Sequence, residues 1–274
     1  MRRGQALRME RVTFKNSRKL TLVGNFHPAA SDAAIILAHG FTSDKSALGR
    51  FDKLAESLNG LGYNVLAFDF SGSGESDPDI LAADKMADDL NSAIAFLRAR
   101  NCRRIALYGH SLGGLICLMC ASPEIGTMVL TGAPTDSMHY DWTAYYSPEQ
   151  LRDLEENGYL TAKDRTGRER MIGRQMLKDF EEIDQRELLK NTSCPVLLIH
   201  GNDPRDQEEC LLLERSQRGI RLLPAGSKLE IIDGANHTFL GHWHRVVEMA
   251  CEWYLSRMPP RLATGQEPSS PGMG

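Results

Sequence analysis

Short apolar segments alternate with segments of helical periodicity along most of this chain, and this alternation constrains its fold most strongly. Eight runs of apolar or β-branched residues have the length of strands. They cover residues 9–14, 19–26, 33–39, 64–70, 103–109, 127–132, 195–200 and 228–233. The first two flank a turn-like KNSRK, as in an antiparallel hairpin, whereas helical stretches that suit parallel crossovers separate the later runs. The sequence therefore predicts an α/β fold with a mainly parallel, eight-stranded sheet.

Amphipathic segments between the runs can cover both faces of that sheet. Residues 46–60 place Leu48, Phe51, Leu54 and Leu58 on one helical face, and residues 85–99 do the same with Met86, Leu90, Ile94 and Leu97. Two helices packed against the sheet are expected from these segments.

The interval 135–191 breaks the alternation. It carries no strand signal, and apolar residues at helical spacing predict short amphipathic helices there. We therefore expect a core in two parts, 9–134 and 192–257, with a small helical cap inserted at 135–191 after the sixth strand. Residues 258–274, rich in Pro, Gly and Ser, are predicted to form a disordered tail.

Composition excludes several classes of partner. The 274 residues include 32 Lys plus Arg and 36 Asp plus Glu, a formal net charge of −4, without the basic stripe that nucleic-acid binding needs. No apolar run approaches the roughly 18 residues of a membrane span, and no apolar stretch follows the charged first residues as in a secretory signal. We expect a cytoplasmic monomer or homodimer that acts on a small molecule.

Neither the cysteines nor the histidines show the spacing of a metal site. The six cysteines are scattered, and Cys117 and Cys120 lie in an apolar helical run where packing explains them better than redox chemistry. His242 and His244 are two residues apart on a predicted helix, hence on different faces. We expect reduced thiols, no metal and no cofactor.

The most informative motif is G-x-S-x-G at residues 109–113, which follows a predicted strand and precedes an apolar helix. This context is that of a nucleophile elbow, in which a strained turn presents the serine hydroxyl outward. Glycines are needed there because a Cβ two residues before or after the serine would crowd the turn. Ser111 is therefore the predicted nucleophile.

A serine nucleophile needs a histidine base and a carboxylate, here expected in the chain order Ser, Asp, His. His237 lies in the loop after the last strand, from which it can reach Ser111. Asp203 follows the preceding strand closely and is the favoured acid, with Asp206 as the alternative.

The oxyanion of such a reaction needs two N–H donors. The loop after the third strand reads HGFTS, and the helix after Ser111 begins at its neighbour. We assign the backbone N–H groups of Phe41 and Leu112 to this role.

Substrate contacts are less defined by the sequence. His110 is a candidate because it adjoins Ser111, and Tyr140, Trp142 and Tyr145 at the start of the cap could line an apolar acyl pocket. Packing of these aromatic residues onto the core explains them equally well.

Five motifs in this order resemble the α/β-hydrolase superfamily: HGF at 39–41, DFSGSGESD at 69–77, GHSLGG at 109–114, HGNDP at 200–204 and GANHTF at 234–239. Within it, the chain resembles cinnamoyl (feruloyl) esterases and the related serine-aminopeptidase-like and monoacylglycerol-lipase-like hydrolases over about residues 10–257. The resemblance puts the nucleophile at Ser111, the acid at Asp203, the base at His237 and the oxyanion donors at Phe41 and Leu112. The run from HG to the acid is one residue shorter than usual, which keeps Asp206 open, and Ser71 stands where the family often has Arg.

These observations predict a serine carboxylesterase that hydrolyses small to medium acyl esters, with aromatic cinnamoyl-type esters as one option, through an acyl-enzyme. The same residues would support an amidase or aminopeptidase-like hydrolase. A protein that uses the fold to bind a ligand without turnover is the third hypothesis.

Overall fold

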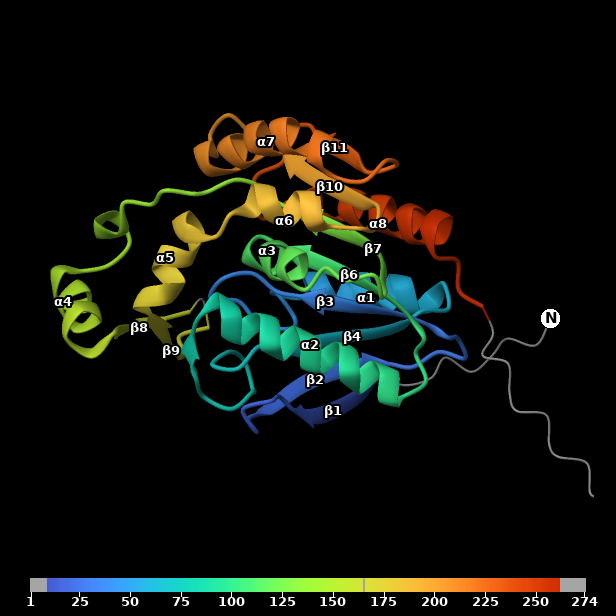
Figure 1. The fold of residues 1–274 in the computed structure, drawn as a ribbon, viewed down its shortest axis with the longest axis horizontal. Helices are drawn as coiled ribbons and strands as arrows, with labels where there is room; N and C mark the ends of the chain where they lie inside the picture. Colours follow the sequence, from blue (N-terminus) through green and yellow to red (C-terminus); the bar gives the residue numbers. More distant parts are fainter. Residues whose placement is uncertain (1–8, 165, 262–274) are drawn as a thin grey trace, which may run out of the picture.

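A computed structural model describes residues 9–164 and 166–261, and its centre is an eight-stranded sheet (Figure 1). The strands are β1 (Glu10–Lys15), β2 (Thr21–His27), β3 (Ala33–Ala38), β4 (Asn64–Asp69), β6 (Arg104–His110), β7 (Ile125–Thr131), β10 (Val196–Gly201) and β11 (Lys228–Ile232). They are ordered β1-β2-β4-β3-β6-β7-β10-β11. β2 is antiparallel to both β1 and β4, and every other pair is parallel. The predicted α/β fold and its eight strands are confirmed.

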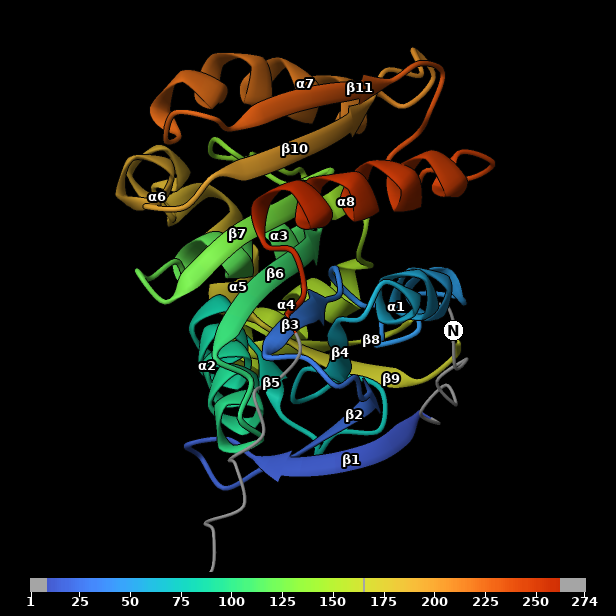
Figure 2. The same ribbon diagram turned by 90° about the vertical axis from the view of Figure 1, so that its right-hand side faces the viewer.

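Helices cover both faces of this sheet (Figures 1 and 2). On one face lie α1 (Arg50–Gly60) and α8 (Trp243–Arg257), and on the other α2 (Ala83–Ala99), α3 (Leu112–Met119), α6 (Gln185–Asn191) and α7 (Gln207–Gly219), with the short η2 (Ile220–Leu222) after it. Both faces need cover because the inner strands carry apolar side chains on each of them. In β3, Ile36 packs into one apolar cluster, whereas its neighbours Ile35 and Leu37 pack into the other. Two separate cores result, one on each side of the sheet.

Helix α1 begins later than its apolar pattern predicts. Ala47, Leu48 and Gly49 all have left-handed backbone conformations, with φ of 47°, 59° and 82°, so the helix cannot include them. Leu48 is consequently 66% exposed and is not a core residue, which corrects the predicted face.

The inserted segment is only partly helical. It contains η1 (Trp142–Ala144), α4 (Pro148–Asn157), β8 (Tyr159–Lys163), β9 (Glu169–Gly173) and α5 (Arg174–Glu182), followed by α6. β8 and β9 form an antiparallel hairpin, and β9 pairs with the short β5 (Ile80–Leu81) of the core. The expectation of no strand here was wrong. Leu160 and Ile172 pair with each other and are buried, but the two strands are short and only pairing of β9 with β5 completes the sheet.

The end of the described chain is held against the core. Met258 O accepts a hydrogen bond from the Tyr63 hydroxyl at 3.0 Å, and Pro259 O accepts one from Arg104 Nη1 at 3.0 Å. Residues 258–261 are thus packed, contrary to the predicted tail, whose remainder, 262–274, lies outside the described residues.

Two expectations from composition can be compared with the structure. Within 9–164 and 166–261, no helix combines the length and apolar character needed to cross a bilayer. All six cysteines are free thiols, and burial raises the pKa of the Cys120 thiol to about 12, which favours packing for the CxxC pair.

Candidate active site

Ser111 occupies a strained turn between β6 and α3. Its backbone has φ 54° and ψ −125°, an unfavourable conformation for a residue with a Cβ. A Cβ on Gly109 would lie 2.5 Å from Gly113 O, and one on Gly113 would lie 2.2 Å from Ala38 O. The tight turn itself therefore requires Gly109, and its close approach to β3 requires Gly113, as the motif predicts.

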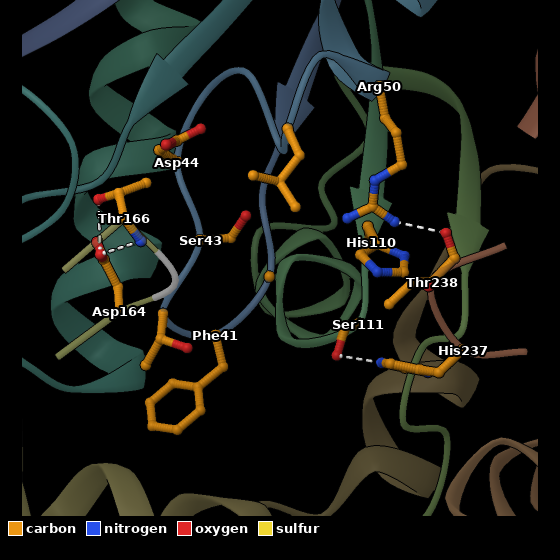
Figure 3. Close-up of a pocket in the computed structure, with 13 residues that line it drawn as sticks. Phe41, Ser43, Asp44, Arg50, His110, Ser111, Asp164, Thr166, His237 and Thr238 are labelled. Atoms are coloured by element: carbon orange, nitrogen blue, oxygen red, sulfur yellow. Dashed lines mark hydrogen bonds between the residues drawn. The ribbon is translucent and has the colours of Figure 1, made fainter. Parts of the chain in front are cut away.

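The structure brings His237 to Ser111 (Figure 3). His237 Nε2 lies 3.0 Å from Ser111 Oγ, across 126 residues of sequence. The histidine comes from the loop between β11 and α8, and its backbone N–H donates to Asp206 Oδ2 at 2.8 Å. These two predicted residues have the geometry of a nucleophile and its base.

The carboxylate beside His237 belongs to Glu209, which is neither of the two predicted acids. Glu209 Oε2 lies 2.6 Å from His237 Nδ1, and the Glu209 side chain has no exposed surface. Glu209 is the third residue of α7, and the helix turns it inward beneath the loop that carries His237. Gly132 makes room for the pair, since a Cβ there would lie 2.9 Å from His237 Nδ1 and 3.1 Å from Glu209 Oε2.

Asp203, the predicted acid, has a different partner. Its two carboxylate oxygens accept hydrogen bonds from Arg205, from Nε at 3.0 Å and from Nη2 at 2.9 Å. That guanidinium also lowers the pKa of the Asp203 carboxyl. The placement of Asp203 against His237 is therefore corrected, because the loop after β10 turns it away before α7 begins.

Asp206, the alternative acid, is an N-cap. Its Oδ1 accepts from Glu209 N–H at 3.1 Å, and its Oδ2 accepts from the His237 backbone N–H. It joins the start of α7 to the histidine loop without touching the imidazole nitrogen that faces Glu209.

One signal in the sequence could have indicated Glu209. The spacing from Asp206 to Glu209 is that of a capping box, which places Glu209 at the third position of a helix. On that helix Glu209 shares its face with Leu212 and Leu213, three and four residues later, and a carboxylate on an apolar face needs a partner.

The charges at this site reinforce one another. Burial disfavours the His237 imidazolium, but the hydrogen bond to Glu209 and the charges of Glu209, Glu208 and Asp206 outweigh it, so the pKa of His237 is raised. Burial also disfavours the Glu209 carboxylate, but hydrogen bonds from His200 and His237 outweigh that effect and lower its pKa. The arrangement favours a negative Glu209 beside a histidine that readily accepts a proton.

The loop with the proposed oxyanion donor lies against the elbow. A Cβ on Gly40 would be 3.2 Å from Ser111 Cβ, so the chain at Phe41 passes close to Ser111. Lys45 holds this loop to the next one, donating from Nζ to Asp69 at 2.6 Å and to Glu75 at 2.7 Å. Leu112 is the first residue of α3, where helix N–H groups lack partners within the helix.

The pocket at Ser111 is mostly polar (Figure 3). Its thirteen lining residues are Gly40, Phe41, Thr42, Ser43, Asp44, Leu48, Arg50, His110, Ser111, Asp164, Thr166, His237 and Thr238. Burial keeps the pKa of His110 well below its ordinary value, so this candidate faces the pocket as a neutral imidazole.

The three aromatic candidates do not line this pocket. Tyr140 and Trp142 pack with Phe180, and Tyr145 is 59% exposed. The Tyr140 hydroxyl donates to Glu208 Oε1 at 2.7 Å. The structure thus supports the packing explanation for Tyr140 and Trp142, with Phe180 also touching Phe41 at the edge of the pocket.

Within the described parts of the chain, no group of three or more His, Cys, Asp and Glu side chains is arranged to hold a metal ion.

Comparison with known proteins places the chain in a family. The thiohydrolase apmlB of Arthrinium phaeospermum is 34% identical over 153 residues, 53% of this chain and 49% of that protein. The serine hydrolase BPHL of Homo sapiens is 28% identical over 213 residues, 71% of this chain and 72% of that protein. The chain spans about half or less of the length of the first curated relatives it matches.

Solved structures share the fold. Est1E from Butyrivibrio proteoclasticus, with ferulic acid bound, superimposes with a TM-score of 0.70 at 21% identity, covering 90% of this chain and 99% of that one. The α/β hydrolase GrgF from Penicillium sp. sh18 gives 0.73 at 19% identity, covering 92% and 99%. The family model described as "Alpha/beta hydrolase family" matches residues 35–249, which hold the elbow, Glu209 and His237, and the chain therefore belongs to the α/β hydrolase family.

Proposed function

We propose that the protein is a serine esterase that hydrolyses small to medium acyl esters through an acyl-enzyme, with Ser111, His237 and Glu209 as its catalytic triad. The observation that carries this proposal is the continuous contact from Ser111 Oγ to His237 Nε2 at 3.0 Å and from His237 Nδ1 to Glu209 Oε2 at 2.6 Å. Membership of a hydrolase family and the esterase among its structural relatives support it.

In the first half of the reaction, Ser111 Oγ attacks the carbonyl carbon of the ester while His237 Nε2 takes its proton. The negative Glu209 stabilises the imidazolium that forms. His237 then gives the proton to the departing alcohol oxygen as the carbon–oxygen bond breaks, which leaves the acyl group on Ser111.

In the second half, water replaces the alcohol. His237 takes a proton from the water as its oxygen attacks the acyl carbon, and returns a proton to Ser111 Oγ when the acid departs. In both halves the carbonyl oxygen becomes negative, and the backbone N–H groups of Phe41 and Leu112 are the donors we assign to it.

Polar residues around Ser111 favour acyl groups of modest size. Thr42, Ser43 and Thr238 present hydroxyl and backbone groups to the pocket, and Phe41 and Leu48 supply its apolar surface. A long aliphatic chain would meet mostly polar groups here, whereas short or compact acyl groups fit this lining.

The test is release of nitrophenol from acetyl, long aliphatic and cinnamoyl esters by the wild-type protein and by S111A. A thioester is assayed beside them because one relative is named a thiohydrolase. We expect turnover of the short or cinnamoyl ester, and a loss in S111A of about 10⁴-fold or more in kcat with an unchanged circular dichroism spectrum.

If wild type and S111A release product at the same rate, the proposed mechanism is wrong. Turnover by neither protein, combined with cleavage of an anilide, would favour the amidase hypothesis. Saturable binding of an ester analogue without product would favour a ligand-binding role.

A further inference from the structure

A second histidine contacts the carboxylate of Glu209 from the side opposite His237. His200, near the end of β10, lies with its Nδ1 2.9 Å from Glu209 Oε1, while His237 Nδ1 lies 2.6 Å from Oε2. The backbone N–H of Gly201 donates to the same Oε1 at 2.9 Å. His200 and Glu209 are both fully buried. The carboxylate is thus fixed on both of its oxygens.

Hydrogen-bonding rules assign the proton positions around His200. A carboxylate can only accept, so the shared proton is on His200 Nδ1. In the tautomer that carries its proton on Nδ1, Nε2 is an acceptor, and Ser216 Oγ lies 2.8 Å from it. Thr135 Oγ1 lies 2.9 Å from Ser216 Oγ and can donate to it in turn.

Thr135, Ser216 and His200 thus form a chain of buried hydrogen-bonding groups that leads to Glu209. Thr135, Ser216 and His200 are each fully buried, so water cannot substitute for any of them without entering the core. Thr135 follows β7, Ser216 lies on α7 and His200 on β10, and the chain therefore ties three elements to one carboxylate.

A triad carboxylate must be held in a fixed orientation by hydrogen-bond donors. During each proton transfer a positive charge appears on His237, and only a carboxylate of fixed orientation stabilises it and keeps the imidazole in the productive tautomer. A buried carboxylate also requires enough donors to remain ionised. Without His200, Glu209 Oε1 would keep only the Gly201 N–H of the two contacts described above.

We propose that His200 is a positioning residue for the hydrolytic reaction, holding Glu209 in the orientation in which it accepts the hydrogen bond of His237. This inference rests on the proposed function, in which Glu209 is the triad acid. His200 touches neither the nucleophile nor the pocket and acts through Glu209.

Two substitutions separate the contacts of His200. In H200N the amide nitrogen takes the position of Nδ1, so the donor to Glu209 is kept and the contact with Ser216 is lost. In H200Q the longer amide reaches the position of Nε2, so the contact with Ser216 is kept and the donor to Glu209 is lost. S216A removes the outer contact alone. These variants therefore differ in which side of the imidazole they preserve.

We expect H200Q to lower kcat by about 10- to 100-fold, the effect of one hydrogen bond to a charged group, with KM nearly unchanged. H200N and S216A should remain within about threefold of wild type. Thermal unfolding of all three variants, followed by circular dichroism, shows whether each is folded at the assay temperature.

The second readout is the pH dependence of kcat/KM. The titratable and charged groups that face His237 are Glu209, Glu208 and Asp206 from α7 and its cap, His110 from β6 and Arg50 across the pocket. H200Q leaves these in place but removes a donor from Glu209, so more of the negative charge acts on His237. The acidic limb should move to higher pH in H200Q and stay at the wild-type position in H200N.

Equal losses in H200N and H200Q, or a loss in H200Q without movement of the acidic limb, would overturn the proposal and leave His200 with a packing role. If the wild-type protein hydrolyses no ester, the proposed function fails, but His200 is still tested. The pKa of the His237 imidazole, measured by NMR in wild type, H200N and H200Q, should rise in H200Q only, and three equal values would overturn the inference.

Discussion

The two halves of the candidate site, the serine elbow and the carboxylate end, are built in different ways. At the elbow, Ser111 lies two residues from each of the glycines that permit its conformation, and a Cβ on Gly109 or Gly113 would lie less than 3 Å from backbone atoms. At the other end, four carboxylates lie within residues 203–209 after β10, and Asp203, Asp206, Glu208 and Glu209 accept hydrogen bonds from different groups.

This difference shows which part of a catalytic site a motif can identify. The elbow is a property of the local backbone, and therefore of a short sequence. The choice among Asp203, Asp206 and Glu209 depends on where α7 begins and how it is rotated. The loop after β10 directs Asp203 to Arg205, Asp206 caps the helix, and the first turn of α7 directs Glu209 to His237.

Neutralising the carboxylates one at a time tests which of them acts with His237, and it should give the largest effect. In E209Q an amide nitrogen facing His237 would force its Nδ1 to accept and its proton onto Nε2, which can then no longer accept from Ser111. We expect kcat to fall by about 10³- to 10⁴-fold. In D203N, which loses only an ion pair with the exposed Arg205, kcat should change less than about threefold. Steady-state kinetics on the ester preferred by wild type measures both.

A large loss in D203N with little effect in E209Q would restore Asp203 as the acid and contradict the assignment. Comparable losses in the two variants would mean that the catalytic charge is shared along the loop, which the separate hydrogen bonds of the two residues argue against.

The pH dependence of the wild-type activity tests the electrostatic effect of Glu209 on His237. Because Glu209 raises the pKa of His237 above its ordinary value of 6.5, kcat/KM should fall as the pH is lowered through a value above 6.5. In E209Q burial acts on His237 without the opposing charge, so the acidic limb of the residual activity should move to lower pH. An acidic limb that is the same in both proteins would show that Glu209 does not set the pKa of His237.

The same raised pKa has the opposite consequence for stability. The folded protein binds the His237 proton more tightly than the unfolded chain does, and this difference adds to the free energy of unfolding. The added stability is fully present below about pH 6.5 and is lost as the pH rises through the raised pKa of His237.

The smallest predicted effect concerns the helix cap. D206A removes the N-cap of α7 and the acceptor for the His237 backbone N–H, and we expect it to lower the free energy of unfolding by about 1 kcal/mol and kcat by several-fold. D184A is the matched control, since Asp184 caps α6 through Glu187 N–H at 2.9 Å and lies outside the pocket lining. Urea unfolding should show similar losses of stability, and kcat should fall only in D206A. A similar fall of kcat in D184A would mean that the loss of a helix cap lowers the activity, and not the loss of the hydrogen bond from the His237 backbone N–H to Asp206.

Much of the fold could be predicted because its elements carry strong local patterns. All eight sheet strands were recognisable as apolar or β-branched runs, and the signal is strongest in inner strands such as β3 and β4, which are buried throughout because both of their faces are covered. The β8–β9 hairpin was not recognisable, because each of its strands buries few residues and its third partner, β5, lies some eighty residues earlier. Leu48 was misplaced because its helical spacing gave no sign of the left-handed turn that ends before Arg50.

The strained turn at Ser111 and the positions of the sheet strands along the chain could be predicted from the sequence, because backbone sterics and apolar periodicity act over a few residues. The pairing of Ser111 with His237 was predicted from the order of the motifs along the chain. The two residues meet at the carboxyl ends of the parallel strands, where the end of β6 lies beside the β11–α8 loop. That Glu209 faces His237, and that His200 contacts the other oxygen of the same carboxylate, is visible only in the folded protein. A buried carboxylate takes its partners from strands, helices and loops that are distant in sequence, and their relative rotation is fixed by packing of the whole core.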